Sequence, residues 1–166
     1  MKAIWRYNMK TRYSKNLMDY NQLDSKIDRI YHNYLSLSGF SLTTMWILYS
    51  AYTSERTPTQ SEICETWRCS PQTINSALKV LEKKEIVQLN FAAGNRKNKY
   101  IHLTDRGMKL CEQLVEPLIQ AENRAFSVLT VEEQENLIAL FQKYSDALDN
   151  EIQLYRKGTD YDTEAN

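Results

Sequence analysis

The chain has little glycine, proline or cysteine, and it lacks a long apolar run. With 4 Gly and 3 Pro among 166 residues, it has few turn-forming residues, which favours a mostly helical protein. Three cysteines are too few, and odd in number, for a disulfide framework. No apolar stretch is long enough to cross a bilayer, and no secretory signal follows the basic residues near the start. These absences predict a soluble cytoplasmic protein, and its length favours a single domain.

The chain also lacks net charge, but its charges are unevenly distributed. Residues 68–106 hold 8 Lys/Arg against 3 Asp/Glu, whereas residues 107–166 hold 5 against 12. A local basic face is what phosphate binding requires, so the zero net charge does not exclude a nucleic-acid partner. The acidic residues of the second half are more simply explained as solvated helix faces.

Residues 59–83 have the pattern of two short helices joined by a turn. Thr59 and Glu62 match a capping box at the start of the first helix. Ser70 followed by Pro71 starts the second helix with a preferred N-cap and a proline at the first helical position. The buried stripe expected on the second helix is Ile74, Ala77, Leu78 and Leu81. The opposite face carries side chains that can hydrogen-bond base edges or phosphates, namely Gln72, Asn75, Ser76, Lys79 and Lys83.

A β-hairpin is predicted over residues 87–103. The apolar positions that alternate with polar ones are Val87, Leu89 and Phe91 on the first strand and Ile101 and Leu103 on the second. Between the strands lies Gly94–Lys99, a loop with three cations and no acid. Thr104 then caps the next helix, with Asp105 in its first turn. Two helices followed by a hairpin with a basic tip form the pattern of a winged helix-turn-helix.

The flanking segments are helical by pattern. Residues 17–37 form an irregular amphipathic helix ended by Ser38-Gly39, and residues 41–53 form a strongly apolar one. The helix that starts after Thr104 should kink or break near Gln113, because Pro117 lies inside it.

The last predicted helix opens with a capping box, Thr130 to Glu133. Its long apolar stripe comprises Leu137, Leu140, Phe141, Tyr144, Leu148 and Ile152. This stripe exceeds what one lobe needs and favours a partner subunit. Packing within the chain against residues 17–37 is the alternative.

Taken in order, these motifs resemble the MarR family of bacterial transcriptional regulators. The residues that carry the resemblance are Thr59 to Ile63, Ser70 to Thr73, Leu81 to Lys84, Asn95-Arg96 and Leu103 to Gly107. The resemblance implies a mainly α fold with a small β-hairpin wing, a homodimer, and double-stranded DNA with a pseudo-palindromic operator as the partner. It also implies one domain over residues 1–166. In this domain residues 57–107 form the DNA-binding lobe, and the dimerisation helices lie in residues 17–53 and 108–157. The polar tail, 158–166, is predicted to be disordered.

Two positions depart from the family pattern. Asn95 stands where the family usually has an Asp that braces the wing arginine, and an amide cannot form an ion pair. Glu85 stands where the family usually has Gly after the recognition helix, which predicts a different helix ending.

The candidate DNA-binding residues lie on the second helix and in the basic loop. They are Ser70, Gln72, Thr73, Asn75, Ser76, Lys79, Lys83, Asn95, Arg96, Lys97 and Lys99. The helix is expected to enter the major groove, with Gln72, Thr73, Ser76 and Lys79 toward bases and Lys83 on phosphate. Arg96 is expected in or along the minor groove, with Lys97 and Lys99 on phosphates.

Other site types have weaker support. The aromatic residues Tyr31, Tyr34, Trp46 and Tyr49 are candidates for a pocket that binds a small aromatic or amphipathic effector, but ordinary packing is the stronger interpretation. Cys69, beside Arg68, is the candidate redox residue, although buried cysteines usually act as small hydrophobes. No Cys/His spacing matches a zinc site, and no motif indicates a cofactor or an enzyme.

Two other functions remain open at this point. A winged helix can be a protein-docking module, but the polar face of the second helix shows no apolar anchors for that role. A small enzyme acting on an aromatic substrate would need a titratable group near Tyr31 and Trp46, and only His32 is near in sequence. Residues 1–16, with five cations and no acid, are a basic arm toward DNA, an extension of a dimer interface, or a frayed terminus.

Overall fold

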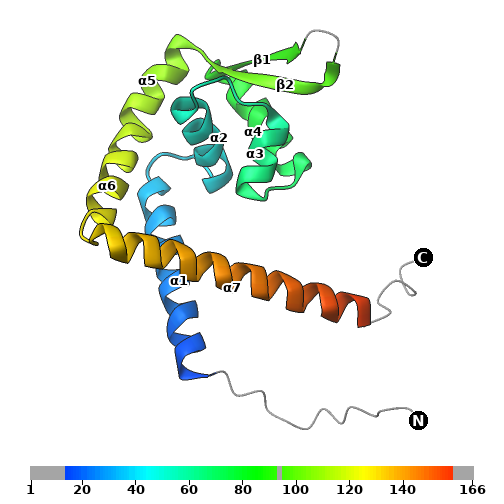
Figure 1. Cartoon of the computed structure of the whole chain (residues 1–166). Coiled ribbons are helices and arrows are strands. Elements are labelled where there is room, and N and C mark those ends of the chain that lie inside the picture. Colours follow the sequence, from blue (N-terminus) through cyan, green and yellow to red (C-terminus); the bar gives the residue numbers. More distant parts are fainter. Residues whose placement is uncertain (1–13, 93–94, 159–166) are drawn as a thin grey trace. The chain divides into compact units, whose positions relative to one another are not determined.

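The computed structural model describes the backbone of residues 14–92 and 95–158, and the side chains of these residues other than 92, 95–98 and 158. Figure 1 shows the described elements: α1 (Lys15–Leu35), α2 (Leu42–Thr53), α3 (Gln60–Trp67), α4 (Pro71–Lys83), β1 (Val87–Ala92), β2 (Asn95–Leu103), α5 (Asp105–Leu114), α6 (Glu116–Phe126) and α7 (Val131–Gly158). The predicted mainly helical fold with a two-stranded antiparallel hairpin is confirmed. Among the described helices, none is both long and apolar enough to cross a membrane.

The chain divides into two compact units, residues 1–115 and 116–166. The boundary falls where a break was predicted, because α5 ends at Leu114 and α6 begins at Glu116. Pro117 explains the break: its ring clashes with the carbonyl of Gln113 in a continuous helix, and it has no N–H to donate. The prediction of a single domain over 1–166 stays a prediction.

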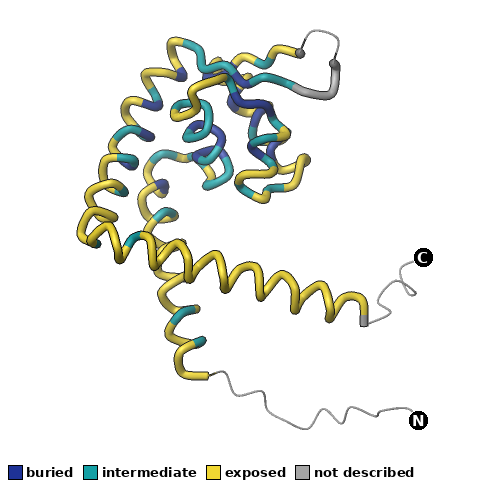
Figure 2. The backbone as a smooth tube through the Cα atoms, in the orientation of Figure 1, coloured by how far each residue is buried: buried dark blue, intermediate teal, exposed yellow. Residues whose placement is uncertain are grey.

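The hydrophobic core of the first unit lies among α2, α3, α4 and the base of the hairpin. In Figure 2 the buried segments gather in these elements. The largest fully buried side chains there are Met45, Ile47, Leu48, Ile63, Ile74, Leu78, Leu81 and Ile101. Burial of each contributes roughly 1.5–3 kcal/mol, so this cluster fixes the three helices against one another. The stripe predicted on α4 is confirmed at these positions, with Ala77 only partly buried.

The predicted helix starts are present. Thr59 accepts from the Glu62 N–H, and the Glu62 side chain accepts from the Thr59 N–H at 2.8 Å, which completes the capping box. Ser70 caps α4 with Pro71 at the start, and Thr104 caps α5 through the Gly107 N–H. Each such cap stabilises its helix by about 0.5–2 kcal/mol.

The end of α4 differs from the prediction. Glu85 adopts a left-handed conformation, with φ of 55°. The Ile86 N–H donates to the Leu81 carbonyl at 2.9 Å, and the Glu85 N–H donates to the Glu82 carbonyl at 2.9 Å. These two bonds form a Schellman motif, the ending that a glycine would give. The expectation of a different helix ending was therefore wrong, because the hydrogen bonds hold a non-glycine residue in the left-handed region.

The hairpin is longer than predicted. Residues expected in the basic loop, from Asn95 onward, already belong to β2. The strands pair antiparallel with Val87 opposite Leu103 and Phe91 opposite Lys99, and the register shifts after Phe91. Phe91 was predicted to face the core, but 56% of it is exposed. The alternation fails there because the outer part of the hairpin extends beyond the helices (Figure 1).

The segment before α3 pairs with the outer side of β2 through backbone hydrogen bonds. Thr59 forms an isolated antiparallel bridge with Tyr100, and the Ile101 N–H donates to the Pro58 carbonyl at 2.9 Å. The start of α3 is therefore tied to β2 by backbone hydrogen bonds. This pairing fixes the hairpin relative to the two helices.

The close approach of α5 to the end of α4 explains why the Leu-Thr-x-x-Gly segment has glycine at position 107. A Cβ at this position would lie 2.0 Å from the Ile86 carbonyl oxygen. The same oxygen accepts from the Thr104 N–H at 3.1 Å, so it cannot move away without loss of that bond. Only glycine lets the first turn of α5 approach the end of α4 this closely.

The second unit consists of α6 and α7. The predicted capping box is present, with the Thr130 N–H donating to Glu133 at 2.8 Å and the Glu133 N–H donating to Thr130 at 3.3 Å. The apolar side chains of α7 are exposed, including Leu140 at 66% and Phe141 at 53%. The tail predicted to be disordered lies outside the described residues from residue 159 on.

Candidate nucleic-acid interface

The helices α3 and α4 form a rigid helix-turn-helix. Arg68 ends α3 in a left-handed conformation with φ of 48°, and Ser70 caps α4 two residues later. The Gln60 side chain donates to the Pro71 carbonyl at 3.3 Å, which connects the two helix starts. The direction of α4 is therefore set by the turn, by its cap and by the buried stripe.

The exposed face of α4 carries most of the predicted DNA-binding residues. The exposed side chains are Ser70, Gln72, Thr73, Ser76, Lys79 and Lys83, whereas Asn75 is half-buried. No ion pair within the described part of the chain involves a lysine of this helix. These lysines therefore keep their charge available for phosphate.

Two of the predicted base-contacting hydroxyl groups have a structural role. The Ser70 and Thr73 hydroxyls lie 2.7 Å apart, and Ser70 also accepts from the Thr73 N–H at 3.1 Å. A base that contacted either hydroxyl would compete with these hydrogen bonds of the α4 cap. Gln72 and Lys79 are not part of it, which makes them the better candidates for base contacts.

Two further residues on the face of α4 were missed in the sequence. Val80 is 49% exposed, and its position between Ser76 and Lys83 places it within the polar face. Lys84 lies over the Phe40 ring, with its Nζ 4.8 Å from the centroid. An i+4 count from Ser76 would have found Val80, but no sequence signal predicts that Phe40 approaches Lys84.

The hairpin carries the predicted wing residues. Lys99 is half-buried and lies over the Phe91 ring at 5.7 Å from the centroid. This contact holds the Lys99 ammonium beside an exposed aromatic ring. The side chains of Asn95, Arg96 and Lys97 lie outside the described residues, so their predicted contacts stay predictions.

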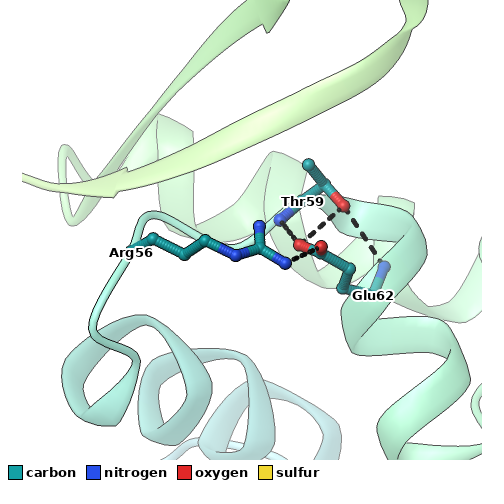
Figure 3. Close-up of polar contacts among 3 residues, drawn as sticks. All are labelled: Arg56, Thr59 and Glu62. Carbon is teal, nitrogen blue, oxygen red and sulfur yellow. Dashed lines mark hydrogen bonds and ion pairs between the residues drawn. The ribbon is translucent and has the colours of Figure 1, made fainter.

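A polar network braces the start of α3 (Figure 3). The Arg56 guanidinium reaches from the connection after α2 to the Glu62 carboxylate, which also accepts from the N–H and hydroxyl of Thr59. The hydrogen bond from Arg56 and the bond from the Thr59 N–H lower the pKa of Glu62 to about 2. Glu62 is therefore ionised at any pH near neutrality.

The aromatic residues proposed for an effector pocket pack mainly on one another. Trp46 meets Tyr31 and Tyr49 edge-on at 5.3 and 5.9 Å and stacks on Trp67 at 4.0 Å. Tyr34 makes a polar contact, in which its hydroxyl donates to the Leu114 carbonyl at 2.7 Å. This geometry favours packing for Tyr31 and Trp46. A role of these residues in effector binding stays a prediction.

The cysteines differ in burial. Cys111 is fully buried, and burial raises its pKa to about 12, so this thiol is unreactive near neutral pH. Burial also raises the pKa of the half-buried Cys64. The Cys69 thiol is half-buried and donates to the Trp67 carbonyl at 3.4 Å. Its redox role stays a prediction. Among the described residues, no group of three or more potential ligands could hold a metal ion.

The comparisons with known proteins agree on the fold. No protein-family model matches the chain. An uncharacterized HTH-type transcriptional regulator from Bacillus subtilis, YwaE, is 28% identical over 114 residues. The matched part is 69% of this chain and spans 66% of the length of that relative.

Solved structures are similar over most of the chain. NMB1585, a MarR family regulator from Neisseria meningitidis, has a TM-score of 0.74 at 18% identity, covering 86% of this chain and 99% of its own. MepR from S. aureus in its DNA-binding conformation has a TM-score of 0.69 at 21% identity, covering 82% and 99%. The MepR–DNA complex has a TM-score of 0.65, at the same identity and coverage. The resemblance inferred from the motifs is thus confirmed in three dimensions: this chain has the winged helix fold of the MarR family regulators.

Proposed function

We propose that the chain is a sequence-specific, DNA-binding transcriptional regulator that acts as a homodimer on a pseudo-palindromic operator and represses transcription. The observation that carries this proposal is the exposed polar and cationic face of α4, held by a turn whose caps and core contacts leave that face free. The similar MepR structure in complex with DNA supports the same use of the fold.

In this proposal α4 enters the major groove and the hairpin lies beside it. Gln72 and Lys79 contact base edges, because glutamine recognises adenine and lysine recognises guanine in that groove. Lys83 and Lys99 contact phosphates, and Arg96 lies along the minor groove. The two lobes of the dimer bind half-sites about one helical turn (~10 bp) apart. A small effector that changes the spacing of the lobes would release the DNA.

The test is binding of the purified protein to the DNA upstream of its own gene. Fluorescence anisotropy is measured across a salt series, with random DNA as competitor. Tight binding that survives the competitor and weakens steeply with salt is the expected result. Weak binding abolished by random DNA would contradict specific recognition and favour the protein-docking alternative.

Three variants separate the contacts. Lys79→Ala should weaken specific binding by roughly five- to 150-fold, since one base contact is worth about 1–3 kcal/mol. Arg96→Ala should weaken binding and reduce the salt slope by about 1. Lys143→Ala, which removes the same charge from α7, is the matched control and should leave both quantities unchanged. An unchanged salt slope for Arg96→Ala would remove the wing from the proposed interface.

A further inference from the structure

We propose that the cavity between the C-terminal half of α2 and α3 is a binding site for a planar aromatic cation. The cavity has a volume of about 800 Å³ and is formed entirely by residues 49–67. All of them lie in the first compact unit, so the cavity does not depend on the position of α6 and α7. Its volume lies within the usual range for small-molecule sites, roughly 300–1,000 Å³.

One wall of the cavity is an indole ring held in a fixed plane. Trp67 lines the cavity and stacks on Trp46, with centroids 4.0 Å apart and planes 9° apart. Its Nε1 donates to the Ser50 hydroxyl at 2.7 Å, which prevents rotation of the ring. Tyr49, also in the lining, meets Trp67 edge-on at 6.0 Å. The Trp67 indole therefore offers the cavity an aromatic surface against which a flat aromatic ligand can pack.

The charges of the lining favour a cation. Glu55 and Glu62 contribute two carboxylates, and Arg56 contributes one guanidinium. Arg56 is already paired with Glu62 (Figure 3). An anionic ligand would therefore meet a guanidinium whose charge Glu62 already balances, whereas a cation finds the Glu55 carboxylate exposed beside the cavity.

The Trp67 indole adds to the preference for a positive charge, because the face of an aromatic ring attracts cations. This cavity is not the effector pocket predicted from the sequence. That pocket comprised Tyr31, Tyr34, Trp46 and Tyr49, and among these four residues only Tyr49 lines the cavity.

The experiment measures fluorescence anisotropy of proflavine, a planar acridinium, titrated with the full-length protein in the absence of DNA. Saturable binding is expected for the wild type. Glu55→Gln, at an exposed position, should weaken it several-fold, and Trp67→Leu should weaken it roughly tenfold or more, through loss of the stacking face. Thr53→Arg, which adds a cation to the lining, should weaken it at least as much as Glu55→Gln.

The controls distinguish this site from nonspecific dye binding. Glu65→Gln makes the same change of charge on α3 outside the cavity lining and should bind proflavine as the wild type does. The planar anion 2-naphthoate should bind far more weakly than proflavine. Equal binding of proflavine by the wild type, Glu55→Gln and Thr53→Arg would overturn the proposal, as would tighter binding of 2-naphthoate. Because the assay contains no DNA, its outcome is independent of the proposed regulator function.

Discussion

Single residues in unusual backbone conformations connect the elements of the DNA-binding lobe. Arg68 and Glu85 both have positive φ; Arg68 directly follows α3, and Glu85 follows Lys84, the C-cap of α4. A left-handed conformation costs a non-glycine residue roughly 1–2 kcal/mol relative to glycine. The chain accepts that cost at Glu85 because the Schellman hydrogen bonds satisfy carbonyls of α4 that would otherwise lack partners.

Glu85→Gly should therefore stabilise the protein. We expect the free energy of unfolding to rise by about 0.5–1 kcal/mol, since the relief of strain exceeds the added chain entropy of glycine. The midpoint of urea unfolding measures this change. Glu82→Gly, the same substitution within α4 itself, is the control and should lower the free energy by about 1 kcal/mol. A loss of stability in Glu85→Gly would show that the glutamate side chain makes a contribution larger than the strain.

At the scale of the element, N-terminal capping by Ser and Thr sets where most of the described helices begin. Six of the seven described helices, α1 to α5 and α7, follow a Ser or Thr whose hydroxyl accepts from the helix backbone. The caps at Thr59, Ser70, Thr104 and Thr130 are why the sequence predicted the starts of α3, α4, α5 and α7. The capping box of α3 differs from that of α7 because Arg56 joins it.

The capping box of α3 should make stability depend on pH. The pKa of Glu62 is lowered to about 2 in the folded protein, below the ordinary value of 4.5. A depressed folded pKa contributes stability above the unfolded value, and this contribution is lost as pH falls from about 4.5 to about 2. Glu62→Gln keeps an oxygen for the box but removes the charge, so it should be less stable than the wild type at pH 7 and nearly equal near pH 2.

Urea unfolding of both proteins at several pH values measures this convergence. Glu133→Gln provides the comparison, because the pKa of Glu133 is also lowered by hydrogen bonds from Thr130 but no cation joins that box. The stability difference between Glu133→Gln and the wild type should depend less on pH than that between Glu62→Gln and the wild type. Parallel curves for Glu62→Gln and the wild type would contradict the ionic role of Glu62.

At the scale of the whole molecule, exposed apolar surface is the main feature that a single copy leaves unexplained. Helix α7 exposes a row of large apolar side chains: Leu137, Leu140, Phe141, Tyr144, Leu148 and Ile152. Helix α1, in the other unit, separately exposes Met18, Leu23, Ile27 and Ile30. Exposed apolar faces of this length usually mark an interface, which supports the proposed homodimer.

We expect the wild type to have twice the chain mass of 19.5 kDa in multi-angle light scattering. The double variant Leu140→Glu with Phe141→Glu should shift to the monomer mass, because two carboxylates cannot be buried unpaired in an apolar interface. Gln153→Glu, on the opposite face of α7, should remain dimeric. A wild type that is monomeric at micromolar concentration would remove the dimer from the proposed function.

The sequence by itself determined the order and nature of the elements, because those depend on local physics. The caps at Thr59, Ser70 and Thr104, the break at Pro117 and the period of the buried stripe on α4 all act within a few residues. The winged helix fold and the polar face of α4 followed from them.

Tertiary structure decided what depends on contacts between distant segments. The outward extension of the hairpin beyond Leu89, the position of Lys84 over Phe40 and the stack of Trp46 on Trp67 involve residues whose proximity no local pattern encodes. Glu85 is the clearest example. Residue preference favoured a different helix ending, but the hydrogen bonds that close α4, and the approach of Gly107 to the Ile86 carbonyl, require the left-handed turn there. The chain adopts it because the combined contacts of the folded lobe outweigh the strain at one residue.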